Sequence, residues 1–108
     1  MILNQIVMKE RITQIDLRNN KETKQFETTI DGQLALIEYS IHDDRIFLTH
    51  TSVPKELSGR GVGSLLVKNS LEEIDRMNLK VVPACTFVKS FIQKHPEYRR
   101  LLATGIEV

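Results

Sequence analysis

The stretch that decides the fold is VPKELSGRGVGSLLVKNSLEEIDRM, which runs from Val53 to Met77. Three glycines stand at alternate positions in it, Gly59, Gly61 and Gly63, and an apolar helical pattern begins directly after them. Glycine lets the backbone adopt positive φ and come close to a ligand. A helix start offers unpaired N–H groups and a partial positive charge. The stretch therefore predicts a loop and helix start that hold a phosphate by main-chain groups.

The spacing of the glycines separates the classes of phosphate-binding loop. A P-loop of nucleotide hydrolases requires GxxxxGK[ST], and no Lys-Ser or Lys-Thr follows these glycines. A dinucleotide-binding loop requires GxGxxG, whereas the glycines here run GxGxG after segments that look like antiparallel strands. A flexible strand-to-helix connector is the structural alternative, although flexibility alone does not explain three glycines so close to a helix start.

Composition limits the possible partners. With 108 residues, 41% of them hydrophobic, the chain is expected to form a single domain over residues 1–108 with its own core. A formal net charge of +1 argues against a nucleic-acid partner. Residues 53–108 hold 9 Lys+Arg and 6 Asp+Glu, so the half with the glycines is the better host for a polyanion.

The expected compartment is the cytoplasm. One cysteine excludes an intramolecular disulfide and fits a reducing environment. No apolar run approaches the ~20 residues of a membrane span, and the N-terminus lacks a signal-peptide pattern, so no membrane partner is expected.

Residues 1–20 form a poorly defined N-terminal segment. Apolar residues between 2 and 7 have helical spacing, residues 12–17 look like a strand, and residues 18–21 are polar enough for a turn. We expect no function in this segment.

From residue 24 onward the pattern is clearer. Asp31-Gly32 is typical of a two-residue hairpin turn, and a second turn is expected over residues 42–44. The expected elements are strands over residues 26–30, 34–39 and 45–53, the glycine loop, a helix over 62–77, a strand over 79–82, and a helix over 84–95. The first three strands form an antiparallel meander, and the fourth is of the kind that pairs in parallel after a crossover.

This order resembles the central part of the fold of the Gcn5-related N-acetyltransferases (GNAT). Residues 58–63 resemble the family's pyrophosphate loop, [QR]xxGx[GA]: Gly61 and Gly63 match, while Ser58 stands where the family usually has Gln or Arg. HTSVPKELSGRGVGSLLV (residues 50–67) and KVVPACTFVKSFIQKHPEY (residues 80–98) are similar to a small single-domain, YjdJ-type branch with the pattern HTxVP…GxG, P-x-C-x-F and H-P-E-Y.

The resemblance covers residues 24–102 and implies a GNAT-like α+β fold. That fold is an antiparallel β-meander leading into a pyrophosphate loop and helix, then a parallel-paired strand and a C-terminal helix. The C-terminus is shortened, because the sequence stops where the superfamily normally adds two strands that help to form the acceptor site.

The resemblance also implies the cofactor and the activity. The protein is expected to be an acetyl-CoA-dependent N-acetyltransferase, without a metal, that acts on a small or peptidic amine as a monomer or weak homodimer. The main chain of Thr51, Ser52 and Val53 would pair with the pantetheine amides. The pyrophosphate site would comprise Ser58, Gly59, Arg60, Gly61, Val62, Gly63 and Ser64. Lys89 and Lys94 are candidates for contacts with the nucleotide phosphates.

Cys85 is the candidate nucleophile. Many family members have a tyrosine acid on the last helix, and Ile92 occupies that position here. Cys85 is expected at the start of this helix, where N–H groups and the helix dipole lower a thiol pKa, so that an acetyl-Cys85 intermediate could form. The alternative is that Cys85 is a small buried hydrophobic residue.

His50 is the candidate partner of Cys85. Strict alternation places His50 on the same strand face as Ile46 and Leu48, where its imidazole could take the thiol proton or the amine proton. The alternative is a hydrogen-bonded interior histidine. Glu38 is another possible base, and Tyr98 is a further candidate for the missing acid. The second functional hypothesis is a non-catalytic acetyl-CoA-binding module, a sensor or carrier.

Overall fold

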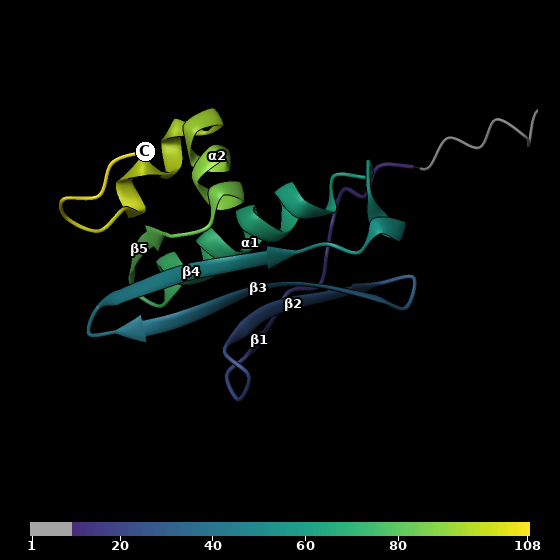
Figure 1. Ribbon diagram of the computed structural model, residues 1–108, viewed down its shortest axis with the longest axis horizontal. Coiled ribbons are helices and arrows are strands. Elements are labelled where there is room, and N and C mark those ends of the chain that lie inside the picture. The colour runs from purple at the N-terminus through teal and green to yellow at the C-terminus, as the bar shows by residue number, and fades with distance from the viewer. Residues whose placement is uncertain (1–9) are drawn as a thin grey trace, which may run out of the picture.

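The computed structural model describes residues 10–108, so the helical spacing expected over residues 2–7 lies outside the described part. The strands are β1 (Arg18–Asn20), β2 (Gln25–Ile30), β3 (Gln33–His42), β4 (Arg45–Ser52) and β5 (Lys80–Pro83). The helices are η2 (Lys55–Leu57), α1 (Val62–Arg76), α2 (Thr86–Lys94) and η3 (Pro96–Leu101). The expected order of elements from the meander to the last helix is confirmed (Figure 1).

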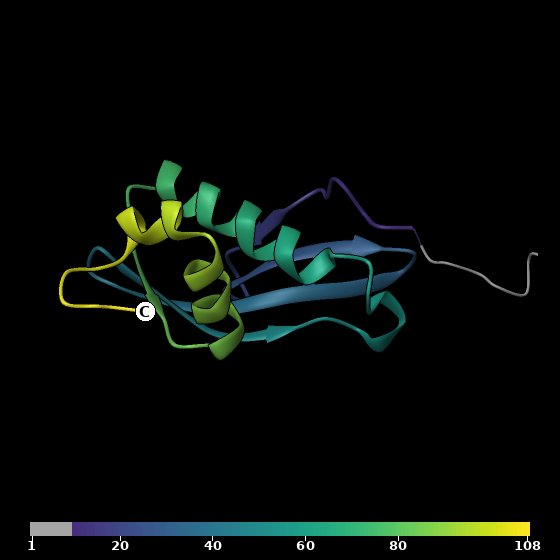
Figure 2. The ribbon, with the colours of Figure 1, turned by 90° about the horizontal axis from the view of Figure 1, so that it is seen from above.

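The five strands form one sheet in the order β1-β2-β3-β4-β5. All neighbours are antiparallel except β4 and β5, which pair in parallel across the α1 connection, as expected. The α+β fold class is therefore confirmed. Both α1 and α2 lie on the same side of the sheet (Figures 1 and 2), and Phe87 of α2 packs against Gly63 at the start of α1.

The turns of the meander follow from local chemistry. Asp31 has φ 51° and Gly32 has φ 75°, the pair of positive φ values that a two-residue hairpin turn requires. Ile30 and Gln33 pair directly across this turn, which fixes the register of β2 and β3. Asn78 ends α1 with φ 59°, and a left-handed stop at this residue agrees with the helix predicted to end at Met77.

The prediction for residues 12–21 is wrong. The structure places strand β1 at Arg18–Asn20, where a turn was expected. Residues 12–17, which were expected to form a strand, have no regular secondary structure and lead directly into β1. Three polar residues can form β1 because it is an edge strand, paired only with β2. Its Arg18 and Asn20 side chains donate hydrogen bonds to the Glu27 carboxylate of β2. Ile12, Ile15 and Leu17 are instead half-buried against the core, so their apolar character reflects packing and not strand pairing.

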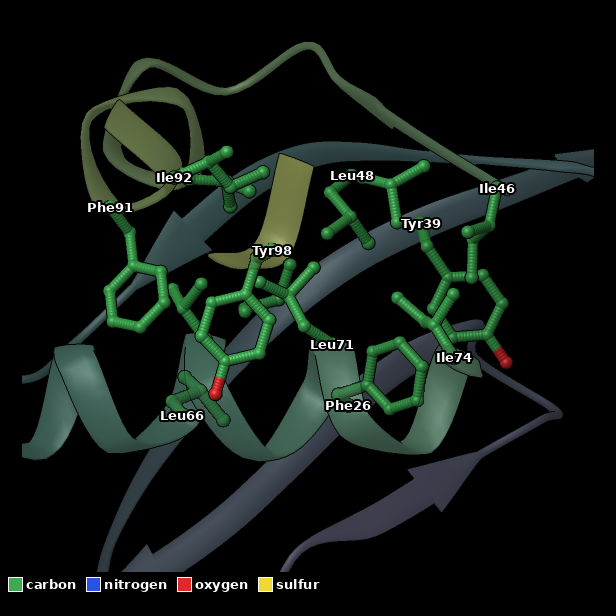
Figure 3. Close-up of a cluster of buried hydrophobic side chains, with 14 of the residues drawn as sticks. Phe26, Tyr39, Ile46, Leu48, Leu66, Leu71, Ile74, Phe91, Ile92 and Tyr98 are labelled. Atoms are coloured by element: carbon green, nitrogen blue, oxygen red, sulfur yellow. The ribbon is translucent and has the colours of Figure 1, made fainter. Parts of the chain in front are cut away.

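The core lies between the sheet and the two helices (Figure 3). Leu66, Leu71 and Ile74 of α1 point toward side chains from the sheet and from η3, and all three are fully buried. Burying a side chain of this size stabilises the fold by roughly 1.5–3 kcal/mol. This packing holds β4 and the start of α1, the two elements that carry the glycine loop, in a fixed relation.

The other face of the sheet has no helix over it in the described part of the chain (Figure 1). Leu34 on this face is 41% exposed. Within residues 10–108 no helix combines the length and the apolar character needed to cross a membrane.

Candidate functional site

The glycine loop joins β4 to α1, and Leu57 anchors it in the core with 1% of its surface exposed. Gly59 and Gly61 have φ values of 78° and 82°, in the left-handed region that favours glycine. Gly63 has a different local role from Gly59 and Gly61. It is helical, and a Cβ atom on it would lie 2.7 Å from Cζ of Phe87, so glycine here lets α2 approach α1 closely.

The start of α1 is an open set of hydrogen-bond donors. Gly61 is the N-cap, and no side chain caps the helix or places an acidic group in its first turn. The first main-chain bond to the cap runs from Leu65 N to Gly61 O, over 3.2 Å, so the preceding N–H groups of the first turn have no partner within the helix. These donors and the helix dipole favour an anion at this position.

Arg60 fixes the loop with its side chain. Its Nη1 lies 2.8 Å from Oδ2 of Asp31 in the β2–β3 turn, and its Nε donates to the carbonyl of Glu10 over 3.1 Å. The N–H of Ile12 donates to the Arg60 carbonyl over 2.8 Å. The guanidinium of Arg60 is thus engaged within the protein, which leaves only its main chain for the expected anion contact.

The strands β4 and β5 separate at Pro83. Their pairing ends at Leu48 with Pro83, which has no N–H to continue a ladder. β4 continues to Ser52 paired only with β3, so its edge toward β5 has no strand partner from Thr49 onward among the described residues. The main-chain groups of Thr51, Ser52 and Val53, expected to pair with pantetheine, lie along this free edge or directly after it.

Cys85 lies in the opening between the two strands. It is the N-cap of α2, is half-buried, and has Sγ 3.3 Å from Oγ1 of Thr51 in a hydrogen bond that either atom can donate. Burial acts to raise the pKa of the Cys85 thiol. The Thr51 hydroxyl and the N–H groups of Val88, Phe87 and Thr51 oppose this, and together they hold the pKa below its ordinary value. These contacts therefore stabilise the Cys85 thiolate relative to that of an ordinary cysteine.

The structure corrects the expected orientation of His50. Tyr39 pairs with Leu48 but its neighbour Glu38 pairs with His50, so β4 carries one extra residue, Thr49, at a β-bulge. Because directly opposite residues share a face, His50 lies with exposed Glu38 on the open face and not with buried Leu48. No hydrogen bond between His50 and Cys85 occurs within the described residues, and the residue beside the thiol is Thr51.

Two adjoining clefts lie between the first half of α1 and α2. The larger has a volume of about 430 Å³. It is lined by Ser64, Thr86, Phe87, Ser90, Phe91, Lys94 and His95. The second, of about 230 Å³, shares Ser64, Phe91 and His95 with the first and extends to Gly61 and Arg11. Of the two lysines expected near nucleotide phosphates, Lys94 lines the larger cleft and Lys89 lines neither.

The remaining candidates have structural partners. Tyr98 is buried and its hydroxyl donates to Oε2 of Glu72 over 3.1 Å; burial, and then this carboxylate, raise the pKa of Tyr98. His95 stacks on Phe91 with ring centroids 4.3 Å apart. Ile92, at the position of the family tyrosine, is fully buried. Within residues 10–108 no three His, Cys, Asp or Glu side chains gather in a way that could hold a metal ion.

The sequence did not predict the side-chain contacts of two residues at the site, Thr51 and Arg11. Thr51 was expected to act through its main chain, and its hydroxyl contact with Cys85 depends on the bulge. Arg11 belongs to a segment in which no function was expected. Neither had a sequence signal, because both placements arise from contacts between residues that are 34 or more positions apart.

Comparison with known proteins gives consistent results. The sequence model of the family described as GCN5-related N-acetyl-transferase matches residues 25–101. Protein NATD1 of Gallus gallus and of Mus musculus are each 27% identical over 85 residues, which is 76% of this chain and 77% of either relative. The NMR solution structure of a GCN5-like protein from Staphylococcus aureus matches with a TM-score of 0.65 and 30% identity, covering 89% of this chain and 94% of that chain.

Proposed function

The chain belongs to the family of GCN5-related N-acetyltransferases, and from this premise we propose that it transfers an acetyl group from acetyl-CoA to an amine by way of Cys85. The observation that carries the proposal is the position of the thiol. Cys85 Sγ lies 3.3 Å from Oγ1 of Thr51, in the opening where β4 and β5 separate. A thioester that follows the free edge of β4 would reach this sulfur.

The cofactor would bind through main-chain groups. Its pyrophosphate would accept hydrogen bonds at the uncapped start of α1, which the loop reaches through the positive φ values of Gly59 and Gly61. Its pantetheine would pair with Thr51, Ser52 and Val53 as an added half-strand, and its nucleotide would lie in the clefts beside α2. Ser58 in place of the usual Gln or Arg is compatible with this because the anion is held by the main chain.

The reaction would proceed in two acyl transfers. The Cys85 thiolate attacks the thioester carbonyl carbon, a bond from Sγ to that carbon forms, and the bond to the coenzyme A sulfur breaks. The proton lost from the Cys85 thiol balances the proton taken up by the coenzyme A thiolate. The neutral amine then attacks the acetyl-cysteine, the amide forms, Cys85 leaves as thiolate, and the amine releases one proton. Exchange of one thioester for another requires no strong acid, which fits Ile92 in place of tyrosine.

His50 would act on the amine and not on Cys85. Its place on the open face of β4, next to Glu38, leaves it on the far side of the strand from the Thr51 side chain. A cationic amine would be attracted by the Glu38 carboxylate, and the imidazole could accept the proton that the amine loses. His50→Gln should therefore slow discharge of the acetyl group to an amine while leaving its loading unchanged. His42→Gln, a second exposed histidine, is the matched control.

Intact-protein mass spectrometry after mixing with acetyl-CoA tests the proposal. An acetyl adduct that is absent from Cys85→Ala, and that amines from a panel of polyamines, amino acids and peptides discharge, supports it. Turnover of an amine by Cys85→Ala at the wild-type rate would refute the cysteine route in favour of direct transfer.

The second candidate function is an acetyl-CoA-binding module. The buried Ile92, which leaves the usual acid position apolar, is the observation in its favour. Tight binding of acetyl-CoA without an adduct, and without turnover over the whole amine panel, would select this function.

The loop is tested separately with Gly61→Val. A side chain at φ 82° is strained, and its Cβ atom would lie 2.7 Å from Nη2 of Arg11 beside the proposed anion site, so affinity for coenzyme A should fall while the fold persists. Unchanged affinity would contradict the placement of the pyrophosphate.

A further inference from the structure

Arg11 places a cation directly against the glycine loop. Its Nη2 lies 2.7 Å from the point that a Cβ atom on Gly61 would occupy, so the guanidinium fills the space that glycine leaves open at the N-cap of α1. It also lines the smaller cleft, next to Ser64 and Lys68. Arg11 lies outside residues 25–101, the part of the chain that the family model covers.

Arg11 forms no ion pair within the described residues, although Glu97 also lines the smaller cleft. The arginines that form ion pairs there are Arg18, Arg60, Arg76 and Arg100. Lys68, the other cation of the smaller cleft, is paired with Glu72 over 2.9 Å. Arg11 is therefore an exposed cation beside a helix start that is itself electropositive, and the two together attract an anion.

The position of Arg11 is fixed by main-chain contacts on both sides. Ile12 N–H donates to the Arg60 carbonyl over 2.8 Å, and Arg60 Nε donates to the Glu10 carbonyl over 3.1 Å. Neither bond uses the Arg11 side chain. The segment is thereby tied to the loop, so less conformational freedom is lost when the guanidinium binds a ligand.

We propose that Arg11 binds the pyrophosphate of coenzyme A together with the amides at the start of α1; this rests on the cofactor site proposed above. The planar guanidinium donates two parallel hydrogen bonds to phosphate oxygens, which a single amide cannot do. The phosphate would thus be held by α1 amides on one side and by a side chain from the N-terminal segment on the other. The N-terminal segment, in which the sequence indicated no function, becomes part of the cofactor site.

The test is calorimetric titration of wild type, Arg11→Gln and Arg11→Lys with coenzyme A, dephospho-coenzyme A and pantetheine. Arg11→Gln should bind coenzyme A and the dephospho form about 10-fold more weakly, equivalent to about 1.4 kcal/mol, with no change for pantetheine. Arg11→Lys should fall between wild type and Arg11→Gln, because it keeps the charge but not the paired donors. The thermal midpoint without ligand should be the same for all three proteins.

Arg76→Gln is the charge-matched control. Arg76 is at the other end of the 15-residue α1, roughly 20 Å from Gly61. The Arg76→Gln substitution therefore removes the same charge without affecting a contact at the proposed pyrophosphate site. An equal loss in this variant would mean a general effect of net charge and would overturn the proposal.

The remaining outcomes of the titrations would each overturn either the assignment of Arg11 or the proposed function. A loss confined to coenzyme A, absent for the dephospho form, would place Arg11 on the 3′-phosphate and overturn its assignment to the pyrophosphate. Unchanged affinity in Arg11→Gln would overturn it entirely. Failure of the wild type to bind coenzyme A would instead refute the proposed function, and the two failures are therefore distinguishable.

Discussion

Replacing Thr51 with valine should raise the pKa of Cys85 with little change in shape. The hydroxyl lies 3.3 Å from the sulfur and is the first of the contacts that oppose the effect of burial on the pKa of the thiol. A hydrogen bond to a charged acceptor stabilises it by about 1.5 kcal/mol at the lower end of the usual range. One pKa unit corresponds to about 1.36 kcal/mol, so the midpoint should rise by about one unit.

The shift has opposite consequences at low and high pH. Well below both midpoints, Thr51→Val has about 10-fold less thiolate, but each thiolate is about 3-fold more nucleophilic because nucleophilicity increases with pKa with a coefficient of ~0.4–0.5. The observed rate should therefore fall about 3-fold in this pH range. Well above both midpoints the variant should react about 3-fold faster than wild type, so the two pH profiles cross.

The assay is the reaction of the protein with a small aromatic disulfide, followed by absorbance over a pH range that spans the midpoint. The chain has one cysteine, so the signal has one source. Thr51→Ser keeps the hydroxyl and should restore the wild-type midpoint. Thr49→Val makes the same change on the same strand, where the hydroxyl donates to the Glu38 carbonyl instead, and should not move the midpoint.

A uniform change of rate at every pH in Thr51→Val would indicate altered access to the sulfur and would refute this reasoning. An unshifted midpoint in Thr51→Val, or a midpoint in Thr51→Ser equal to that of Thr51→Val, would do the same.

Three further predictions concern stability and the remaining candidate acid. The pKa of buried Glu27 is held low, chiefly by the hydrogen bond from Gln25, although burial opposes it. The stability that this carboxylate contributes is present above its ordinary pKa of 4.5 and is lost as the pH falls through the lowered folded pKa. Glu27→Gln should therefore cost about 1–2 kcal/mol at pH 7 and flatten the loss of stability below the ordinary pKa, as measured by urea unfolding. Leu71→Ala, at a fully buried position of α1, should destabilise the fold by about 2–5 kcal/mol in the same assay, and a cost below about 1 kcal/mol would contradict the described core. Tyr98→Phe removes only the hydrogen bond to Glu72 and should cost about 1 kcal/mol with no effect on the rate of acetyl loading, whereas a large fall in that rate would make Tyr98 the missing acid.

The elements were predictable where local chemistry determines them. Asp31 and Gly32 adopt the positive φ values of a two-residue hairpin turn, and Asn78 ends α1 in the left-handed conformation. The meander and the end of this helix could therefore be predicted from the sequence. The same method failed at residues 12–21. There the apolar residues pack without pairing and the polar residues pair at an edge, and both outcomes depend on tertiary neighbours that no local pattern records.

The site was predictable in its main chain but not in its side chains. Gly59 and Gly61 were predictable because their positive φ values favour glycine. Cys85 was expected at the start of the last helix, and it is the N-cap of α2. The orientation of His50 was wrong because one unpaired residue, Thr49, reverses the alternation of the strand beyond it. A bulge leaves no mark in an alternating pattern of polar residues, since both faces of β4 beyond Leu48 have polar side chains.

That single extra residue also explains how one strand could serve two substrates. Before the bulge, Ile46 and Leu48 face the helices and belong to the core. Beyond it, Thr51 faces the helices and touches Cys85, while His50 faces the open side of the sheet, opposite Glu38. In the proposed reaction the thioester would approach along the helix side and the free edge of β4, and the amine from the side that no helix covers. Without the bulge His50 would point into the core face and Thr51 away from the thiol, so the same strand could neither stabilise a thiolate nor present a base to the amine.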